Sequence, residues 1–270
     1  MPTEDGIVAD NLSHTPQRET VEIQKELFDV KKSKLQKYKE IILGEAGFGF
    51  LLKFELITLF VSWLPGALGL LLRSKLYPTL LGSVGRNVTF GANVVLRHPK
   101  KIHIGNDVII DDNVVLDAKG QNNRGLFIGN GVFIGRNTIL SCKNGDIHLH
   151  DNANLGFNTH LFSASNVTVG KNTLLAAYVY LVGGTHEFDR LDVPILFQTR
   201  VSHGITVGEN GWLGAHAVVF DGVTIGNECI IGAGAMVNQD IPDWKIAAGV
   251  PCRVVKDRRQ LSGEKEVVSI

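Results

Sequence analysis

The residue types best suited to chemistry gather in one short segment, Gly183-Gly184-Thr185-His186-Glu187-Phe188-Asp189-Arg190. His186 is the leading candidate, because a neutral imidazole can accept a proton near pH 7 and so act as a general base. Glu187, its neighbour, is a candidate substrate contact. A lone histidine in a loop is usually only solvated, so the elements that position this segment decide its role.

The rest of the chain is dominated by small aliphatic residues at every sixth position, often followed by glycine. The cleanest copies are Val207-Gly208, Leu213-Gly214, Val219, Ile225-Gly226, Ile231-Gly232 and Val237. Neither the 3.6-residue period of a helix nor the two-residue period of a strand produces this pattern. Six residues can form one short strand and a corner, and three such units close a triangular coil of about 18 residues. The sequence therefore predicts an all-β solenoid over residues 82–250.

The start of each coil carries an apolar-x-apolar-Gly signal, as in Val167-Thr168-Val169-Gly170 and Ile205-Thr206-Val207-Gly208. The interval between these two copies is about twice the expected coil length. Residues 183–204 are therefore predicted to be an inserted loop, and this loop carries His186.

Composition excludes several classes of protein. The 270 residues are 44% hydrophobic, and 27 basic residues balance 27 acidic ones, so no nucleic-acid-binding surface is expected. Cys142, Cys229 and Cys252 form no CxxC pair, which argues against a disulfide framework and suits a reducing cytoplasm. Cys229 falls on a coil position and is expected to be buried.

The N-terminal part lacks the six-residue period. Residues 1–20 are polar and are predicted to be a disordered tail, whereas residues 21–81 contain an amphipathic helix from Val21 to about Glu45 and an apolar helical segment. The apolar run from Leu56 to Leu72 is interrupted by Pro65-Gly66 and is too short to span a bilayer, and no cleavable signal precedes it.

Two interpretations of residues 50–76 stay open at this point. The segment either caps the open end of the solenoid or forms an interfacial hairpin, with Arg73 and Lys75 at the lipid headgroups. The expected location is the cytoplasm, with peripheral association at the inner face of the membrane under the second interpretation.

The C-terminal coils carry small residues, including Gly232-Ala233-Gly234-Ala235 and Ala247-Ala248-Gly249. Small residues on successive coils leave a smooth groove for a long, thin ligand. Arg253 and Lys256 follow and could contact phosphates. Residues 251–270, to which both belong, are predicted to form a basic C-terminal tail.

A metal site would need two histidines about five residues apart and a third on a neighbouring coil. His98 and His103 have this spacing, but no third histidine lies within a coil or two upstream, so no metal is expected. Four histidines fall on coil faces and are expected to be surface or interface residues: His103, His148, His150 and His160.

Taken together, these motifs resemble the hexapeptide-repeat acyltransferases, in the branch of maltose and galactoside O-acetyltransferases and of exopolysaccharide acetyltransferases. The resemblance covers residues 84–256. It rests on the Thr-His loop at Thr185-His186, Gly211-Trp212-Leu213-Gly214-Ala215, the run Ile231-Gly232-Ala233-Gly234-Ala235-Met236-Val237, and Ala248-Gly249-Val250-Pro251-Cys252-Arg253.

The resemblance implies a left-handed parallel β-helix, a homotrimer with active sites at the subunit clefts, and acetyl-CoA as cosubstrate. It makes His186 the base that deprotonates an acceptor hydroxyl, and Asn158 an acceptor contact. It also implies a set of coenzyme contacts: Trp212, Gly214, Ala215, Ala233, Ala235, Arg253 and Lys256.

The predicted function is therefore transfer of an acetyl group from acetyl-CoA to a hydroxyl of a saccharide or glycan precursor. The long apolar N-terminal segment favours a glycan on a membrane-bound carrier. The alternatives are a metal-dependent hydratase of the carbonic anhydrase type and a non-catalytic trimeric scaffold.

Overall fold

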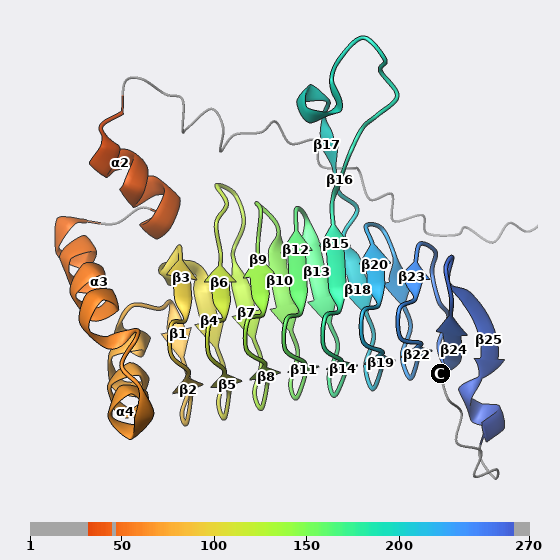
Figure 1. The fold of residues 1–270 in the computed structure, drawn as a ribbon, viewed down its shortest axis with the longest axis horizontal. Helices are drawn as coiled ribbons and strands as arrows, with labels where there is room; N and C mark the ends of the chain where they lie inside the picture. The colour runs from red at the N-terminus through yellow and green to blue at the C-terminus, as the bar shows by residue number, and fades with distance from the viewer. Residues whose placement is uncertain (1–31, 45–46, 262–270) are drawn as a thin grey trace, which may run out of the picture.

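The computed structural model describes residues 32–44 and 47–261, which form a straight parallel β-solenoid with helices at one end (Figure 1). The predicted tail at residues 1–20, residues 21–31 of the predicted first helix and residues 262–270 of the basic tail lie outside the described residues. The predicted fold class is confirmed.

Three parallel sheets form the sides of the solenoid. The first sheet contains β1 (Ser83–Val84), β4 (Ile102–Ile104), β7 (Leu126–Ile128), β10 (Asp146–Leu149), β13 (Asn166–Val169), β18 (Ile205–Val207) and β21 (Thr224–Ile225). The second contains β2 (Thr89–Phe90), β5 (Ile109–Ile110), β8 (Phe133–Ile134), β11 (Asn154–Leu155), β14 (Leu174–Leu175), β19 (Trp212–Leu213), β22 (Ile230–Ile231), β24 (Lys245–Ala248) and the antiparallel β25 (Arg253–Asp257). The third contains β3 (Val95–Arg97), β6 (Val115–Asp117), β9 (Ile139–Ser141), β12 (His160–Ser163), β15 (Tyr180–Gly183), β20 (Val218–Phe220) and β23 (Met236–Val237).

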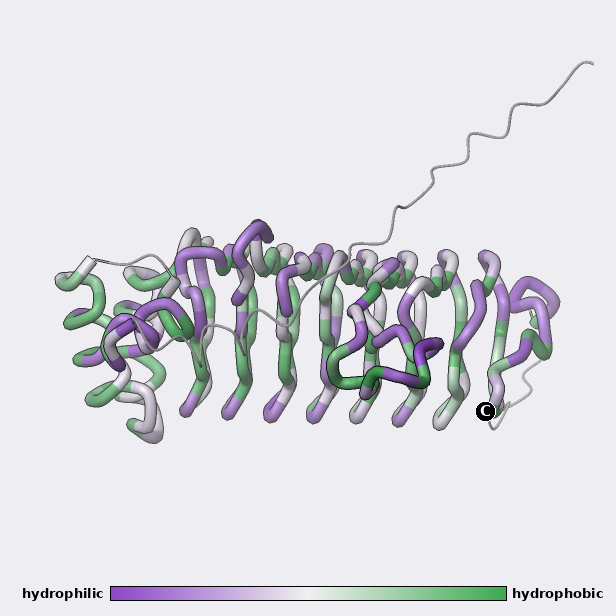
Figure 2. Tube along the Cα trace, turned by 90° about the horizontal axis from the view of Figure 1, so that it is seen from above, coloured by the Kyte–Doolittle hydropathy of each residue, from purple (hydrophilic) through white to green (hydrophobic). Residues whose placement is uncertain are grey.

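The aliphatic residues of the six-residue period point into the solenoid. All six residues of the cleanest stretch are at most 1% exposed: Val207, Leu213, Val219, Ile225, Ile231 and Val237. Cys142, Cys229 and Cys252 are also buried and unpaired. Figure 2 shows the hydrophobic segments repeated from coil to coil along the axis. The period is therefore a packing constraint, because each inward residue must fill the same narrow interior.

The coils are not all 18 residues long. Ser83 and His103 are register partners 20 positions apart, as are Asn152 and Asn172, whereas Glu209 and Asn227 lie 18 apart. The longer coils accommodate third-sheet strands of up to four residues, such as β12. The sequence expectation of 18 residues thus holds only toward the C-terminal end.

The inserted loop forms an arm that leaves the solenoid between β15 and β18, which Figure 1 shows rising above the coils. Its base is a two-stranded antiparallel ribbon of β16 (Thr185–His186) and β17 (Arg200–Val201), and its outer part contains the 3-10 helix η4 (Ile195–Phe197). Parallel pairing of β13 with β18 resumes the solenoid below it.

The helices precede the solenoid, apart from short 3-10 turns. They are α2 (Lys34–Tyr38), the π-helix η1 (Lys39–Leu43), α3 (Phe48–Val61), α4 (Gly66–Leu76) and η2 (Tyr77–Thr79), with η3 (Pro99–Lys101) and η5 (Arg258–Leu261) later in the chain. One face of α3, formed by Leu51, Phe54, Ile57 and Val61, joins the same buried cluster as the first coil. The helical hairpin therefore covers the open end of the solenoid. Within residues 32–44 and 47–261, no helix is both long and apolar enough to cross a membrane.

Arg73 is not at a lipid headgroup, and that expectation is wrong. Its side chain is 2% exposed, and its guanidinium donates hydrogen bonds to the carbonyls of Val61 (3.2 Å), Leu64 (2.6 Å) and Phe90 (2.9 Å). These carbonyls include orphan acceptors at the C-terminal end of α3, which buried backbone must satisfy. Lys75, the other expected headgroup contact, is exposed.

We expect Arg73→Ala to lower the free energy of unfolding by about 2–4 kcal/mol, because it removes packing and leaves the Leu64 and Phe90 carbonyls without a donor. Denaturant titration measures the change. The control is Lys75→Ala, which should stay within about 0.5 kcal/mol of the wild type. Equal stability of the two variants would contradict this account of the helical hairpin.

His98 predicts a dependence of stability on pH. Its Nε2 lies 2.8 Å from the carbonyl of Glu40, and burial lowers the pKa of the His98 side chain, with Lys101 and Lys119 acting in the same direction. Below the unfolded pKa of about 6.5 the unfolded chain therefore binds more protons. We expect the melting temperature to fall as the pH drops from 7 toward 5, and to fall less in His98→Gln; an equal slope in both proteins would refute the role of His98.

Candidate active site

His186 lies on the ribbon at the base of the arm, directly opposite Arg200 in the antiparallel register. The Arg200 Nε donates a hydrogen bond of 3.1 Å to His186 Nε2. Because an arginine N–H can only donate, the neutral imidazole must carry its proton on Nδ1 and its lone pair on Nε2. Nε2 is therefore the basic atom of this ring.

The Nδ1 atom of His186 is buried and has no hydrogen-bond partner among the described residues. A buried donor without a partner is unfavourable, so this N–H is suited to a carbonyl or carboxylate supplied from outside the chain. Neither Glu187 nor Asp189 provides one. The Glu187 backbone pairs with Thr199, and Asp189 is exposed farther along the arm.

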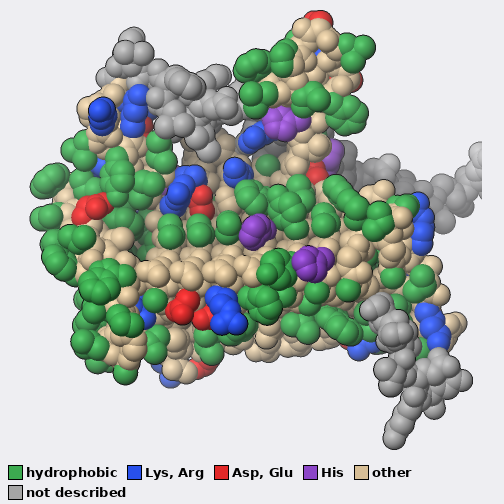
Figure 3. Space-filling model, in the orientation of Figure 1, with side chains coloured by type: hydrophobic (Ala, Val, Ile, Leu, Met, Phe, Trp, Pro, Cys, Tyr) green, Lys and Arg blue, Asp and Glu red, His purple; other side chains and the backbone are tan. Residues whose placement is uncertain are grey.

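The outer part of the arm is strongly apolar. Its exposed residues include Phe188 (74%), Leu191 (99%) and Phe197 (71%), and Figure 3 shows hydrophobic side chains gathered over the arm. Exposed apolar clusters of this kind mark surfaces that contact another molecule.

The small residues lie where the second sheet turns into the third, which we call the 2–3 corner. Gly214 is required there, because a Cβ at this position would lie 2.5 Å from the backbone nitrogen of Ala233 on the next coil. Ala215 and Ala233 stack on successive coils, and the Gly234 N–H donates to the Ala215 carbonyl at 2.8 Å. Ala235 differs from the prediction, since its side chain lies in the core and cannot contact a ligand.

The backbone amides of Ala215 and Ala233 donate no hydrogen bond within the described part of the chain. Earlier on the same corner, side chains occupy the equivalent amides: Asp112 accepts from Ala92 N at 2.6 Å and Asp111 accepts from Arg136 N at 3.3 Å. The equivalent amides of Phe157 and Ala177 likewise donate no hydrogen bond within the described residues, so the corner changes from capped amides to open ones at Phe157. Open amides on an exposed edge can bind a carbonyl or an oxyanion.

The other predicted coenzyme contacts flank this corner. Trp212 lies on the outer face of the second sheet and is 45% exposed. Arg253 begins β25 opposite Ala248, and its Nη1 donates to its neighbouring carbonyl at 2.7 Å. Lys256 pairs in register with Ile246 and is partly buried.

Asn158 also lies on the 2–3 corner, in a left-handed conformation with φ of 56°. The next two residues in this position are Tyr178 and His216, whose rings stack with centroids 4.7 Å apart and planes 5° apart. Non-glycine residues held in this conformation cost of order 1–3 kcal/mol each, and asparagine tolerates it best. A tyrosine in this conformation therefore destabilises the fold locally, relative to asparagine.

Sequence reasoning missed Arg200, Tyr178 and the neighbouring Phe157 as site residues. Arg200 could have been found only from the hairpin register of the arm, 14 residues from His186. Tyr178 and Phe157 could not be aligned from the sequence, because coils of 18 and 20 residues hide the pairing of the Tyr178 N–H with the Phe157 carbonyl.

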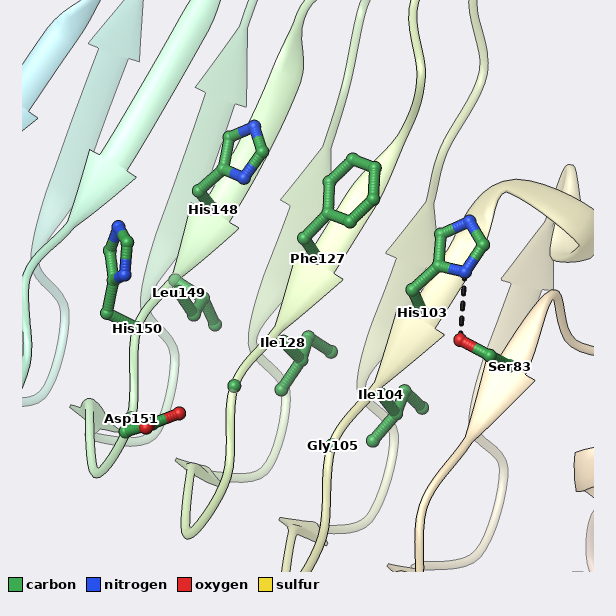
Figure 4. Close-up of a pocket in the computed structure, with 11 residues that line it drawn as sticks. Ser83, His103, Ile104, Gly105, Phe127, Ile128, His148, Leu149, His150 and Asp151 are labelled. Carbon is green, nitrogen blue, oxygen red and sulfur yellow. Dashed lines mark hydrogen bonds between the residues drawn. The ribbon is translucent and has the colours of Figure 1, made fainter.

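A second concave surface lies on the outer face of the first sheet. It is a groove of about 380 Å³ in which His103, Phe127 and His148 stack at 5.0 and 4.8 Å, with Ser83 Oγ 2.9 Å from His103 Nδ1 (Figure 4). Burial lowers the pKa of His148. The predicted surface placement of these histidines agrees with the structure.

The histidines do not converge on a metal site. His98 faces the Glu40 carbonyl under the helices, whereas His103 lies on the outer face of the first sheet. Among residues 32–44 and 47–261, no group of three or more histidine, cysteine or acidic side chains is placed to hold a metal ion.

Within one chain, the base and the open amides are far apart. Tyr178, on the 2–3 corner, precedes β15, and Thr185-His186 follows the opposite end of the same strand. A four-residue strand separates the two corners by about 13 Å.

Comparison with known proteins agrees with this geometry. The family model described as the hexapeptide repeat of succinyl-transferase matches residues 83–118 and 204–239. Galactoside O-acetyltransferase of Escherichia coli K12 is 39% identical over 117 residues, which are 42% of this chain and 54% of that protein. Galactoside O-acetyltransferase of Lactococcus lactis IL1403 is 32% identical over 111 residues, covering 40% and 52% of the two chains.

The chain thus spans about half the length of these curated relatives. Among solved structures, the N-acyltransferase AntD of Bacillus cereus, in complex with dTDP and 3-hydroxybutyryl-CoA, matches with a TM-score of 0.50 and 21% identity. The match covers 74% of this chain and 93% of AntD and concerns the fold alone. In its repeat and in these matches, the chain is thus similar to the hexapeptide-repeat acyltransferases.

Proposed function

We propose that the protein is an acetyl-CoA-dependent O-acetyltransferase that acts on a hydroxyl of a saccharide or glycan precursor. The observation that carries the proposal is the pair of open amides at Ala215 and Ala233 on a corner kept free of bulky side chains. The similarity to two galactoside O-acetyltransferases supports both the reaction and the acceptor class.

His186 is the proposed general base. Its Nε2 would accept the proton of the acceptor hydroxyl once Arg200 releases that atom, while Nδ1–H donates a hydrogen bond to an acceptor from outside the chain. The imidazolium would then give this proton to the thiolate leaving group, while the pairing of Arg200 with Nε2 in the resting site orients the ring. Arg200 is thus a positioning residue.

The coenzyme fits the 2–3 corner and its flanks. When bound, acetyl-CoA supplies an activated acyl thioester. The amides of Ala215 and Ala233 would donate to the thioester oxygen and to the pantetheine arm, beside Gly214 and against the exposed ring of Trp212. Arg253 and Lys256 lie beyond the corner, toward the C-terminal end, and would meet the nucleotide phosphates.

The active site is proposed to form between copies in a homotrimer. In one chain the open amides lie on the 2–3 corner, before β20 and β23, whereas His186 follows the far end of the neighbouring strand β15. This separation supports a site in which another copy supplies the His186 that serves a given corner. The apolar outer part of the arm supports this arrangement, since Phe188, Leu191 and Phe197 need a covering surface.

Peripheral membrane association at the cytoplasmic face is proposed for the helical hairpin. Besides covering the first coil, α3 and α4 expose a second apolar face, visible in Figure 3 at the helical end. This outer helical face contains Phe48, Leu52, Leu56, Leu59, Phe60, Trp63, Leu68, Leu70 and Leu71, each 42–71% exposed. A helix that served only as a cap would be polar on this side.

His186→Ala should lower turnover at least about 100-fold, because a positioned general base contributes about 10²–10⁴. The measurement is thiol release from acetyl-CoA in the presence of saccharide acceptors, with the trimer checked by light scattering. His203→Ala, an exposed histidine at the exit of the arm, is the matched control.

Near-normal turnover of His186→Ala would contradict the base assignment. Absence of coenzyme binding by the wild type would favour a non-catalytic scaffold, and a stoichiometric bound metal would favour a hydratase.

The double variant Leu59→Asn/Phe60→Asn should reduce sedimentation with phosphatidylglycerol vesicles at least several-fold, since both side chains are exposed on the outer helical face. Ile109→Asn, an exposed apolar residue on the second sheet, is the control and should sediment like the wild type. Equal sedimentation of all three proteins would rule out membrane association through this face.

A further inference from the structure

We infer that the exposed rings of the 2–3 corner form a platform for the sugar ring of the acceptor. This inference rests on the proposed function and assigns the acceptor side of that site. The platform consists of Phe157, Tyr178 and His216, flanked by Arg136 and Asn158.

The fold does not require aromatic rings at this place. The same left-handed position on the preceding coils is held by four asparagines with φ between 56° and 60°: Asn93, Asn113, Asn137 and Asn158. Tyr178 and His216 then take it with φ of 63° and 60°. Because asparagine and histidine adopt this conformation with less strain than tyrosine, the ring of Tyr178 is better explained by a contact with a ligand.

The rings form a continuous exposed row. Tyr178 is stacked on His216 and meets Phe157 edge-on at 5.8 Å, and the Arg136 guanidinium lies 5.7 Å from the Phe157 centroid. Phe157 is 43% exposed and Tyr178 47%. Half-exposed rings braced by their neighbours are rigid apolar surfaces with little conformational entropy left to lose on binding.

The position of the row indicates which substrate it serves. His216 follows Ala215 directly, so the row begins beside the open amides of Ala215 and Ala233 and extends toward the N-terminal coils, along the equivalent amides of Ala177 and Phe157. The proposed coenzyme contacts Ala233 and Arg253 extend from the same amides in the opposite direction. A substrate lying on the row would thus approach the thioester from the side that the coenzyme leaves free.

The chemistry of the row fits a neutral pyranose. One face of such a ring is made of C–H groups, which pack on aromatic rings, and its rim carries hydroxyls. Asn158 and the planar guanidinium of Arg136 supply donors beside the rings. Asp111 and Asp112 lie on the same corner next to Arg136, which disfavours an anionic acceptor at this end.

The test uses Tyr178→Asn and Phe157→Asn in the full chain. Tyr178→Asn restores the residue of the preceding coils, so its melting temperature should equal or exceed that of the wild type. Binding of a panel of methyl hexopyranosides is measured by saturation-transfer NMR without coenzyme, and coenzyme A binding is measured separately by calorimetry.

We expect both variants to weaken saccharide binding and to raise the saccharide KM about tenfold or more, with the coenzyme A affinity within twofold of the wild type. Trp244→Asn is the matched control, because Trp244 is also an exposed ring with positive φ (65°) but lies on a different corner. It should change neither affinity.

Three results would overturn the platform: unchanged saccharide affinity in both variants, a loss of coenzyme A affinity in place of saccharide affinity, or no binding of any hexopyranoside by the wild type. Failure of the proposed function would look different. If the wild type binds hexopyranosides on the row but neither binds coenzyme A nor transfers acetyl groups, only the proposed transferase activity is refuted.

Discussion

The structure depends on the in-register hydrogen bonding of each coil to the next. Parallel pairing fixes the spacing between coils at about 4.8 Å, so residues at equivalent positions become neighbours whatever their separation in sequence. Rows of like residues result, such as the inward aliphatic residues and the amide chain of Asn152, Asn172 and Asn210. Functional groups on this scaffold are therefore arranged along rows. A functional site is expected where the side chains or the free backbone groups of a row change.

The 2–3 corner changes character twice. Its amides are first capped by aspartates and are open from Phe157 onward, as at Ala215 and Ala233. Its left-handed position passes from asparagine to aromatic residues and then to Gly234. Both changes occur over neighbouring coils, close to the coil that carries the arm. The coincidence of open backbone donors with the coil that carries the insertion is the reason why we propose this corner as the coenzyme site.

Sequence alone predicted the solenoid and the inward residues, because the six-residue period is itself the packing constraint. It also located the arm, since a doubled interval between coil starts leaves no other place for the extra residues. The sequence could not predict which corner residues lie side by side on neighbouring coils, because some coils have 18 residues and others 20. The Arg200–His186 contact depends on a hairpin register outside the period, and the burial of Arg73 depends on carbonyls that no pattern reveals.

The return of β25 along β24 has a consequence for how copies of the chain can associate. An unpaired parallel edge at the end of a solenoid is a template on which another molecule can add its own strand, and repetition of that step gives fibres. Antiparallel pairing with β25 occupies the edge of β24, while α4 contacts β2 at the other terminus of the same sheet. Growth along the axis is thereby blocked for this sheet, which directs assembly to the sides of the prism, where closed rings can form.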